Sequence, residues 1–141
     1  MMNAAFLFIT TIFLTVVNIF NITYKGNEIN RIVTNLPLQI LKSNVVIEEY
    51  TEDDFVAYFS KKETEESVKN YLNLSFKGII DKYNLSFYYY FINNNKEYEF
   101  DMSDKPKAFQ LHFNCTYYKN YKVDRYLNFT IEDIGSSLWI I

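Results

Sequence analysis

The sequence predicts an α+β protein in which an N-terminal membrane helix continues into an amphipathic helix, and a further helix packs on a four-stranded antiparallel meander. Three observations predict it: an uncharged apolar run at the start, apolar residues at helical spacing in the middle, and alternating apolar and polar residues in the second half. They divide the chain into a transmembrane anchor (1–23), a kinked amphipathic helix (24–43), an α+β domain (44–133) and a C-terminal tail (134–141).

The anchor is the stretch Ala4–Ile22, which has no charged side chain and carries apolar residues on every face of a helix. At about 1.5 Å per residue it would make a rod of roughly 28 Å, close to the hydrocarbon thickness of a bilayer. A cleaved signal peptide normally begins with basic residues and ends at a small-x-small site, and a buried helix of a soluble protein is seldom apolar all round. Neither description fits this stretch, so we expect an uncleaved, single-pass membrane helix.

The charges that flank the anchor give only a weak indication of its orientation. Lys25 and Arg31 follow the apolar run, and no Lys or Arg precedes it. The positive-inside rule would therefore favour a cytoplasmic C-terminal domain, but a difference of so few charges leaves the orientation open.

A second helical pattern follows the anchor and reaches about Ser43. Gly26 is a weak point at which the helix can bend, and Pro37 removes one backbone hydrogen bond, which favours a kink. We expect one long broken helix whose outer half packs on the domain, with two unrelated helices as the alternative. The apolar residues at helical spacing are Ile29, Ile32, Val33, Leu36 and Ile40.

The next segment combines a possible strand, Val45–Ile47, with an acidic stretch at 48–54. The acidic stretch lacks the alternating ligands and central Gly of a calcium loop, so a solvated surface is the preferred interpretation. Thr51 is a candidate N-cap for a short helix after it. The helical face of that short helix would consist of Phe55, Tyr58 and Phe59.

The clearest helix of the domain runs from Glu65 to Tyr83, with Thr64 as its candidate cap. Polar residues such as Lys77 occupy one side, so the helix is amphipathic and packs on a flat partner. Its apolar stripe consists of Val68, Tyr71, Leu72, Phe76, Ile79, Ile80 and Tyr83.

The flat partner is a sheet. Alternation of apolar and polar residues predicts strands at 85–91, 109–117 and 123–131, and a shorter strand at 98–101 pairs back on the first. Four consecutive strands with short turns predict a meander with one apolar face, which the 65–83 helix covers.

The composition excludes several classes of function. A formal charge of −3 and a pI near 5.2 give no electrostatic basis for binding nucleic acid. No glycine-rich phosphate loop occurs among three glycines. His112 and Cys115, the only residues of their kinds, would lie on opposite faces of one strand, which excludes a Cys–His nucleophile pair and a zinc site. We therefore expect a protein without catalytic residues, cofactor or metal.

Two groups of residues are candidate contacts for partners. Thr11, Thr15 and Asn18 share one face of the anchor at four- and three-residue steps, where hydroxyl and amide groups can bond to a neighbouring helix. Tyr88 and Tyr90 lie on the outer face of the first strand, where their rings could stack on a ligand. The plainer alternatives are polar residues tolerated in a simple tether, and tyrosines of an ordinary exposed strand face.

The order of apolar helix, amphipathic half and four-stranded sheet resembles the pilin and pseudopilin plan. Within it, a helix followed by the S-F-Y-Y-Y strand at 86–90 and a meander is similar to TadE-like, Tad-pilus-associated membrane proteins of low-GC Gram-positive bacteria. The resemblance implies a non-catalytic structural or assembly subunit of a pilus- or secretion-type cell-surface apparatus. Its partners would be the membrane and other subunits of the assembly, and its domain would be extracytoplasmic.

The chain departs from the pilin pattern at its beginning. A prepilin peptidase site would place Gly before the apolar run and commonly Glu five residues into it, whereas this chain reads Met-Met-Asn-Ala and has no acid before Glu28. We therefore expect a subunit retained in the membrane. Two alternatives stay open: a virion or envelope membrane protein of an AT-rich virus, and a membrane-tethered ligand-binding domain.

Overall fold

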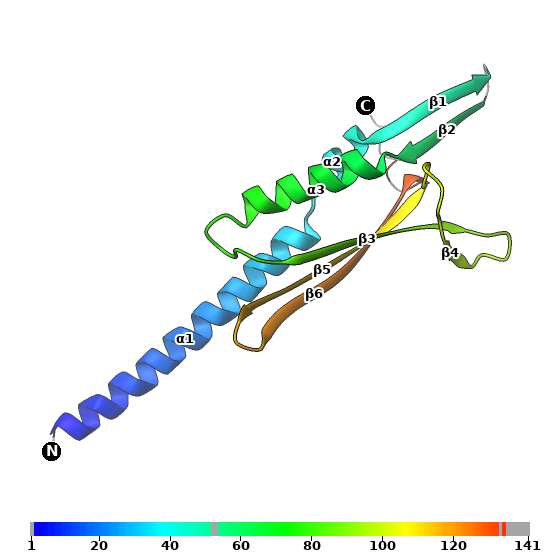
Figure 1. Cartoon of the computed structure of the whole chain (residues 1–141). Coiled ribbons are helices and arrows are strands. Elements are labelled where there is room, and N and C mark those ends of the chain that lie inside the picture. The colour runs from blue at the N-terminus through cyan, green and yellow to red at the C-terminus, as the bar shows by residue number, and fades with distance from the viewer. Residues whose placement is uncertain (1, 52–53, 133, 135–141) are drawn as a thin grey trace.

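A computed structural model describes residues 2–51, 54–132 and 134. A long bent helical segment leads into a further helix and a four-stranded antiparallel sheet, which confirms the predicted α+β class (Figure 1). The elements are α1 (Met2–Thr34), α2 (Leu38–Ser43), β1 (Val45–Thr51), β2 (Asp54–Phe59), α3 (Lys61–Ser75), β3 (Asn84–Ile92), β4 (Tyr98–Phe100), β5 (Ala108–Tyr118) and β6 (Tyr121–Thr130).

The predicted long broken helix is present, and its break lies at Pro37. Helix α1 ends at Thr34, and Pro37 takes an extended conformation (φ −64°, ψ 125°) at the start of α2. Pro37 has no N–H to continue the helical ladder, but its fixed φ suits a helix start. The predicted weak point at Gly26 is instead part of continuous helix, and this glycine serves a close approach. A Cβ added there would collide with the ring and hydroxyl of Tyr117 on β5.

The predicted short helix with a face of Phe55, Tyr58 and Phe59 is wrong, because this segment is strand β2. It pairs antiparallel with β1, which includes the predicted strand at 45–47 and extends to Thr51. The helical spacing did not decide the structure, because aromatic and β-branched residues favour strands when a partner strand is present. The Tyr58 hydroxyl donates to the Glu48 carboxylate at 3.0 Å, across the two strands.

Helix α3 is displaced from the predicted Glu65–Tyr83 range: it begins at Lys61 and ends at Ser75. Thr64 is therefore a buried residue of the first turn, and Ser60 precedes the helix. The helix ends with Phe76 as its C-cap, and two residues later Gly78 adopts a left-handed φ of 82°, which glycine tolerates best. The apolar stripe nonetheless continues past the end, since Ile79 and Ile80 pack against the core from the following turn.

The predicted four-stranded antiparallel sheet is confirmed, but its strands do not follow chain order. The order is β4-β3-β5-β6, so β5 pairs with β3 on the edge opposite β4. Tyr90 of β3 lies between Phe100 on one side and Ala108 on the other. Strand β4 has only three residues, so it occupies one end of β3, and the long β5 pairs with the rest.

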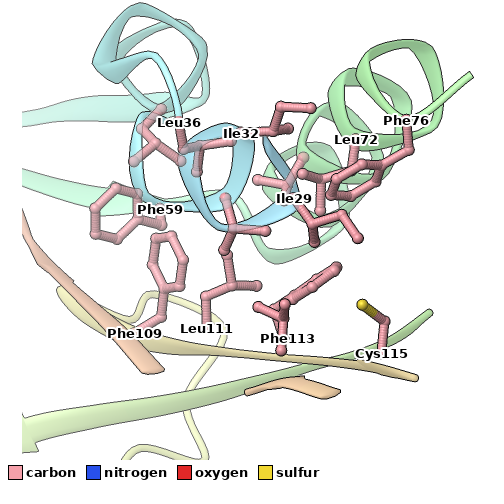
Figure 2. Packing of buried hydrophobic residues seen from close by; sticks show 14 of the residues in the cluster. Ile29, Ile32, Leu36, Phe59, Leu72, Phe76, Phe109, Leu111, Phe113 and Cys115 are labelled. Atoms are coloured by element: carbon pink, nitrogen blue, oxygen red, sulfur yellow. The ribbon is translucent and has the colours of Figure 1, made fainter. Parts of the chain in front are cut away.

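The core lies between the sheet and two helices, with α3 and the C-terminal half of α1 on the same face (Figure 2). Phe109 meets Phe59 of β2 edge to face at 4.9 Å, and Phe113 stacks on Phe76 at 5.4 Å. Ile134 is also buried, and the rest of the predicted C-terminal tail lies outside the described residues. From α1, α2 and the residues that join them the core includes Ile29, Ile32, Val33, Leu36 and Leu41.

Candidate functional site

The most exposed apolar surface of the molecule is the N-terminal half of α1. It projects away from the domain (Figure 1), and its large apolar side chains between Phe6 and Phe20 are 36% to 71% exposed. This helix, near the N-terminus, is long enough and apolar enough to cross a membrane. A signal sequence meets the same criteria of length and composition. Nothing within the described part of the chain covers these side chains.

The predicted contact residues Thr11, Thr15 and Asn18 lie on this continuous helix, where their spacing places them on one face. The Thr11 hydroxyl donates to the Leu7 carbonyl at 2.7 Å, and the Thr15 hydroxyl donates to the Thr11 carbonyl at 2.8 Å. Both hydroxyl protons are therefore used inside the helix, which leaves acceptor lone pairs for a neighbour. Asn18 lies nearest the domain, beside Tyr117 and Tyr118 of β5.

The predicted tyrosines belong to a shallow groove on the outer face of the sheet. Tyr88 is exposed, and the ring of Tyr90 meets that of Tyr98 edge to face at 5.2 Å. The groove measures about 690 Å³. It is lined by Tyr88, Tyr90, Tyr98, Glu99, Phe100, Gln110, Tyr126, Asn128 and Thr130.

Strand pairing explains why these residues meet. Tyr88 lies beside Gln110, and Gln110 lies beside Asn128, so three strands contribute one row. The Gln110 amide donates to the Asn128 side-chain oxygen at 3.2 Å. Alternation predicts that Tyr126 lies on the outer face, but only the strand order brings Tyr98 from β4 to the same groove.

His112 and Cys115 lie on opposite faces of β5, as predicted. His112 stacks on Tyr126 with ring centroids 4.1 Å apart, and its Nε2 lies 2.5 Å from Asp124 Oδ1. Cys115 is buried in the core, where burial raises the pKa of its thiol. Among the described residues, no group of three or more His, Cys, Asp or Glu side chains could hold a metal ion.

A polar contact joins the first turns of α3 to strand β3 of the sheet. The Tyr89 hydroxyl donates to Glu65 at 3.0 Å, and Lys61 Nζ lies 4.8 Å from the centre of the Tyr89 ring. Burial, and then the nearby carboxylate, raise the pKa of Tyr89 well above its usual range. The phenol therefore stays protonated as a hydrogen-bond donor, which indicates a structural role.

The β5–β6 hairpin is fixed to the C-terminal half of α1. Arg125 donates to the side-chain oxygen of Asn30, and Tyr117 covers Gly26. Two hollows of about 400 and 200 Å³ separate the hairpin from α1 around Ile22. The hairpin end is thus held where the apolar run of the helix stops.

Comparisons with known proteins give no relative from which a role could be transferred. No protein-family model matches the chain, and no curated protein or solved structure matches it significantly. Its function must therefore be argued from the two surfaces described above, the apolar half of α1 and the outer groove.

Proposed function

We propose that this protein is a membrane-anchored, non-catalytic subunit of a pilus- or secretion-type cell-surface assembly. The observation that carries the proposal is the exposure of the large apolar side chains of α1 from Phe6 to Phe20, which are 36% to 71% exposed. Leaving one large apolar side chain in water instead of burying it costs about 1.5–3 kcal/mol. A helix with so many exposed apolar side chains requires an apolar environment, and the hydrocarbon core of a bilayer supplies it.

The continuity of α1 favours a lasting anchor over a removable signal. The same helix that exposes Phe20 buries Ile29, Ile32 and Val33 in the core. Ile22-Thr23-Tyr24 follows the apolar run without the small-x-small pattern of a cleavage site. An anchor built into the core of its domain is suited to holding that domain against partners.

The outer groove supports a role in contact. Its rings, Tyr88, Tyr98 and Tyr126, are exposed and combine apolar area with a polar hydroxyl, which suits them to protein interfaces. The plan of a long helix projecting from an antiparallel sheet also agrees with the resemblance to pilin-like subunits. An extracytoplasmic domain is part of this proposal.

The same groove favours a second candidate, a membrane-tethered domain that binds a small ligand. A hollow of about 690 Å³ lined by aromatic rings lies within the size range of ligand pockets. Stabilisation of the protein by a ligand would distinguish this candidate, because a ligand bound only to the folded state raises the melting temperature.

The test of the proposal is a comparison of anchors in the native host. The variant Thr11→Leu/Thr15→Leu/Asn18→Leu is more apolar than the wild type, so it should stay in the carbonate-resistant membrane fraction. The variant should no longer co-purify with neighbouring membrane subunits, because the hydrogen-bonding face of its own anchor has been removed. Thr10→Leu, which lies off the centre of that face, is the matched control and should retain co-purification.

Two results would contradict the proposal. Recovery of the wild-type chain in the soluble fraction without detergent would remove the anchor. Unchanged co-purification with neighbouring subunits after exchange of residues 4–22 for an unrelated membrane helix would show that the anchor is not the contact. The outer groove would then remain as the interaction surface.

A further inference from the structure

The end of the β5–β6 hairpin lies at the level where the apolar run of α1 stops. One hollow between them is lined by Asn18, Asn21, Ile22 and Lys25 on α1 and by Tyr117 and Tyr118 on the hairpin. Figure 1 shows the turn between β5 and β6 beside α1, as the part of the domain nearest the projecting half of the helix. We call residues 117–122 the hairpin tip.

The position of the hairpin tip can be expressed as a depth. If the apolar run ends at Ile22 on the surface of the hydrocarbon, Lys25 lies about 4.5 Å beyond it at 1.5 Å per residue. The headgroup region on each side of a bilayer is roughly 5–7 Å thick. At the same rise, Asn18 lies about 6 Å on the hydrocarbon side of Ile22. Because the hairpin tip faces Asn18 to Lys25, it lies at the boundary between the hydrocarbon and the headgroups whenever α1 spans the membrane.

The exposed side chains of the hairpin tip have the chemistry of that layer. Tyr118 and Tyr121 are 43% and 52% exposed, and Tyr24 of α1, two residues after the apolar run, is 64% exposed. Tyrosine is enriched at membrane–water interfaces because its ring is apolar and its hydroxyl is polar. The rings of Tyr118 and Tyr121 contact each other, with centroids 6.3 Å apart.

The charge at this end of the molecule is opposite to the charge of the whole. Lys119 and Lys122 lie in the hairpin tip and Lys25 lies on α1, while no Asp or Glu occurs in 3–27 or in 116–123. The complete chain has a formal charge of −3. The first acid beyond the tip, Asp124, lies 2.5 Å from His112 on the outer face of the sheet.

We infer that the hairpin tip, with Tyr24 and Lys25, is a second membrane contact that rests on the headgroups of anionic phospholipids. The inference depends on the proposed function, in which α1 spans the bilayer. The tyrosines enter the interfacial layer and the lysines attract lipid phosphates. This contact fixes the domain against the membrane surface, and it does so in either orientation of the chain.

The first experiment measures depth with single tryptophans in full-length protein reconstituted into vesicles. Trp139, the only tryptophan, is replaced by Phe, and probes are introduced as Phe13→Trp, Tyr118→Trp and Tyr98→Trp. Tyr98 is the matched control, because it is an exposed tyrosine on β4, at the far end of the sheet from the projecting half of α1 (Figure 1). Lipids brominated high on the acyl chain should quench the probe at 118 and leave the probe at 98 unquenched.

The probe at 13 separates failure of the inference from failure of the proposed function. Quenching at 13 without quenching at 118 would overturn the headgroup contact and leave the anchor intact. The probe at 13 lies about 13.5 Å below Ile22, near the bilayer centre, so it is read with lipids brominated near the end of the acyl chain. Absence of this quenching at 13 would overturn both, because the contact requires an inserted helix. Equal quenching at 118 and 98 would show that the whole domain lies on the surface, which also contradicts the inference.

The second experiment tests the charge of the lipid. Vesicles of phosphatidylcholine with phosphatidylglycerol should quench the Tyr118→Trp probe more than vesicles of phosphatidylcholine alone. In Lys119→Gln/Lys122→Gln this difference should disappear, since each lysine near an anionic surface strengthens its attraction by about fivefold. The matched control Lys69→Gln/Lys77→Gln removes two exposed lysines of the α3 region and should keep the difference. Quenching that is equal in both vesicles would overturn the anionic-lipid contact.

Discussion

The two halves of α1 belong to one continuous helix and have opposite surroundings. Between Phe6 and Phe20 the apolar side chains are exposed, whereas Ile29, Ile32 and Val33 are 0% to 5% exposed in the core. The sequence differs accordingly, because the first half is apolar on every side and the second has one apolar face. On the other face of the second half, Arg31 donates to Glu28. Apolar content therefore indicates that a segment must be shielded from water. The presence of charges and the spacing of the apolar residues indicate whether the domain core does this or another environment does.

The boundary between the halves is marked by contacts with the β5–β6 hairpin. Tyr117 packs over Gly26, and Arg125 donates to Asn30. Among the described residues of α1, the buried apolar side chains all lie after Gly26. The comparison therefore predicts that equal substitutions will have unequal effects along one helix.

The largest difference is expected from placing a charge in each half. Ile29→Asp buries a carboxylate without a partner and removes core contacts, which should cost about 5 kcal/mol or more. The domain should then lose its cooperative unfolding transition by circular dichroism. Ile12→Asp, in the exposed half, should leave that transition in place and reduce the membrane-bound fraction. Equal loss of folding in both variants would contradict the division of α1.

The next effect concerns α3, which covers the same face of the sheet as the second half of α1. Phe76 is buried and stacks on Phe113, so Phe76→Ala should lower the free energy of unfolding by about 3–5 kcal/mol. Chemical denaturation measures this difference. The adjacent Lys77 is exposed, and Lys77→Ala should change the value by less than about 0.5 kcal/mol. A large effect of Lys77→Ala would mean that the buried stripe has been misassigned.

A smaller effect is expected at the boundary itself. Alanine normally stabilises a helix by about 1 kcal/mol relative to glycine. Gly26→Ala should instead destabilise by about 1–2 kcal/mol, because its Cβ collides with Tyr117. In a Tyr117→Ala background the same substitution should stabilise, so a double-mutant cycle reveals the contact through a change of sign. Equal stabilisation in both backgrounds would show that the Tyr117 ring moves aside freely.

The smallest effect is a difference in thiol reactivity. Cys115 is buried in the core, and burial raises the pKa of its thiol, so a maleimide should label it slowly until the protein unfolds. Because the folded state holds the proton more tightly, this group stabilises the fold below its ordinary pKa and the contribution is lost as the pH rises. Ile12→Cys in a Cys115→Ser background should be protected only while the chain is in vesicles. Fast labelling of native Cys115 would contradict the buried position.

Strong periodic patterns in the sequence predict the elements of this fold, and local ambiguity accounts for the errors. The spacing of Phe55, Tyr58 and Phe59 fits a helix face, but their aromatic side chains also suit a strand, and pairing with β1 makes this segment strand β2. The stripe of α3 extends to Tyr83 because residues after Gly78 still face the core, although the helix has ended. Burial alone therefore cannot locate the end of this helix.

The candidate site was predicted only as far as single strands allow. Alternation places Tyr88 and Tyr90 on the outer face of β3, where the structure has them lining the groove. The groove itself depends on strand order, because β4 brings Tyr98 and β6 brings Tyr126. Alternation specifies faces and does not specify neighbours, since many orders of four strands bury the same residues.

The absence of a break within α1 from Met2 to Thr34 has a mechanical consequence. Without a hinge at Gly26, torque applied to the apolar half turns the domain through the same angle. Each residue inserted near 23 would rotate the domain by about 100° and lift it by about 1.5 Å. The azimuth at which the outer groove faces its surroundings is therefore set by the number of residues between the groove's domain and the bilayer. A partner helix bound to the face of Thr11 and Thr15 would therefore also fix the direction in which the outer groove faces.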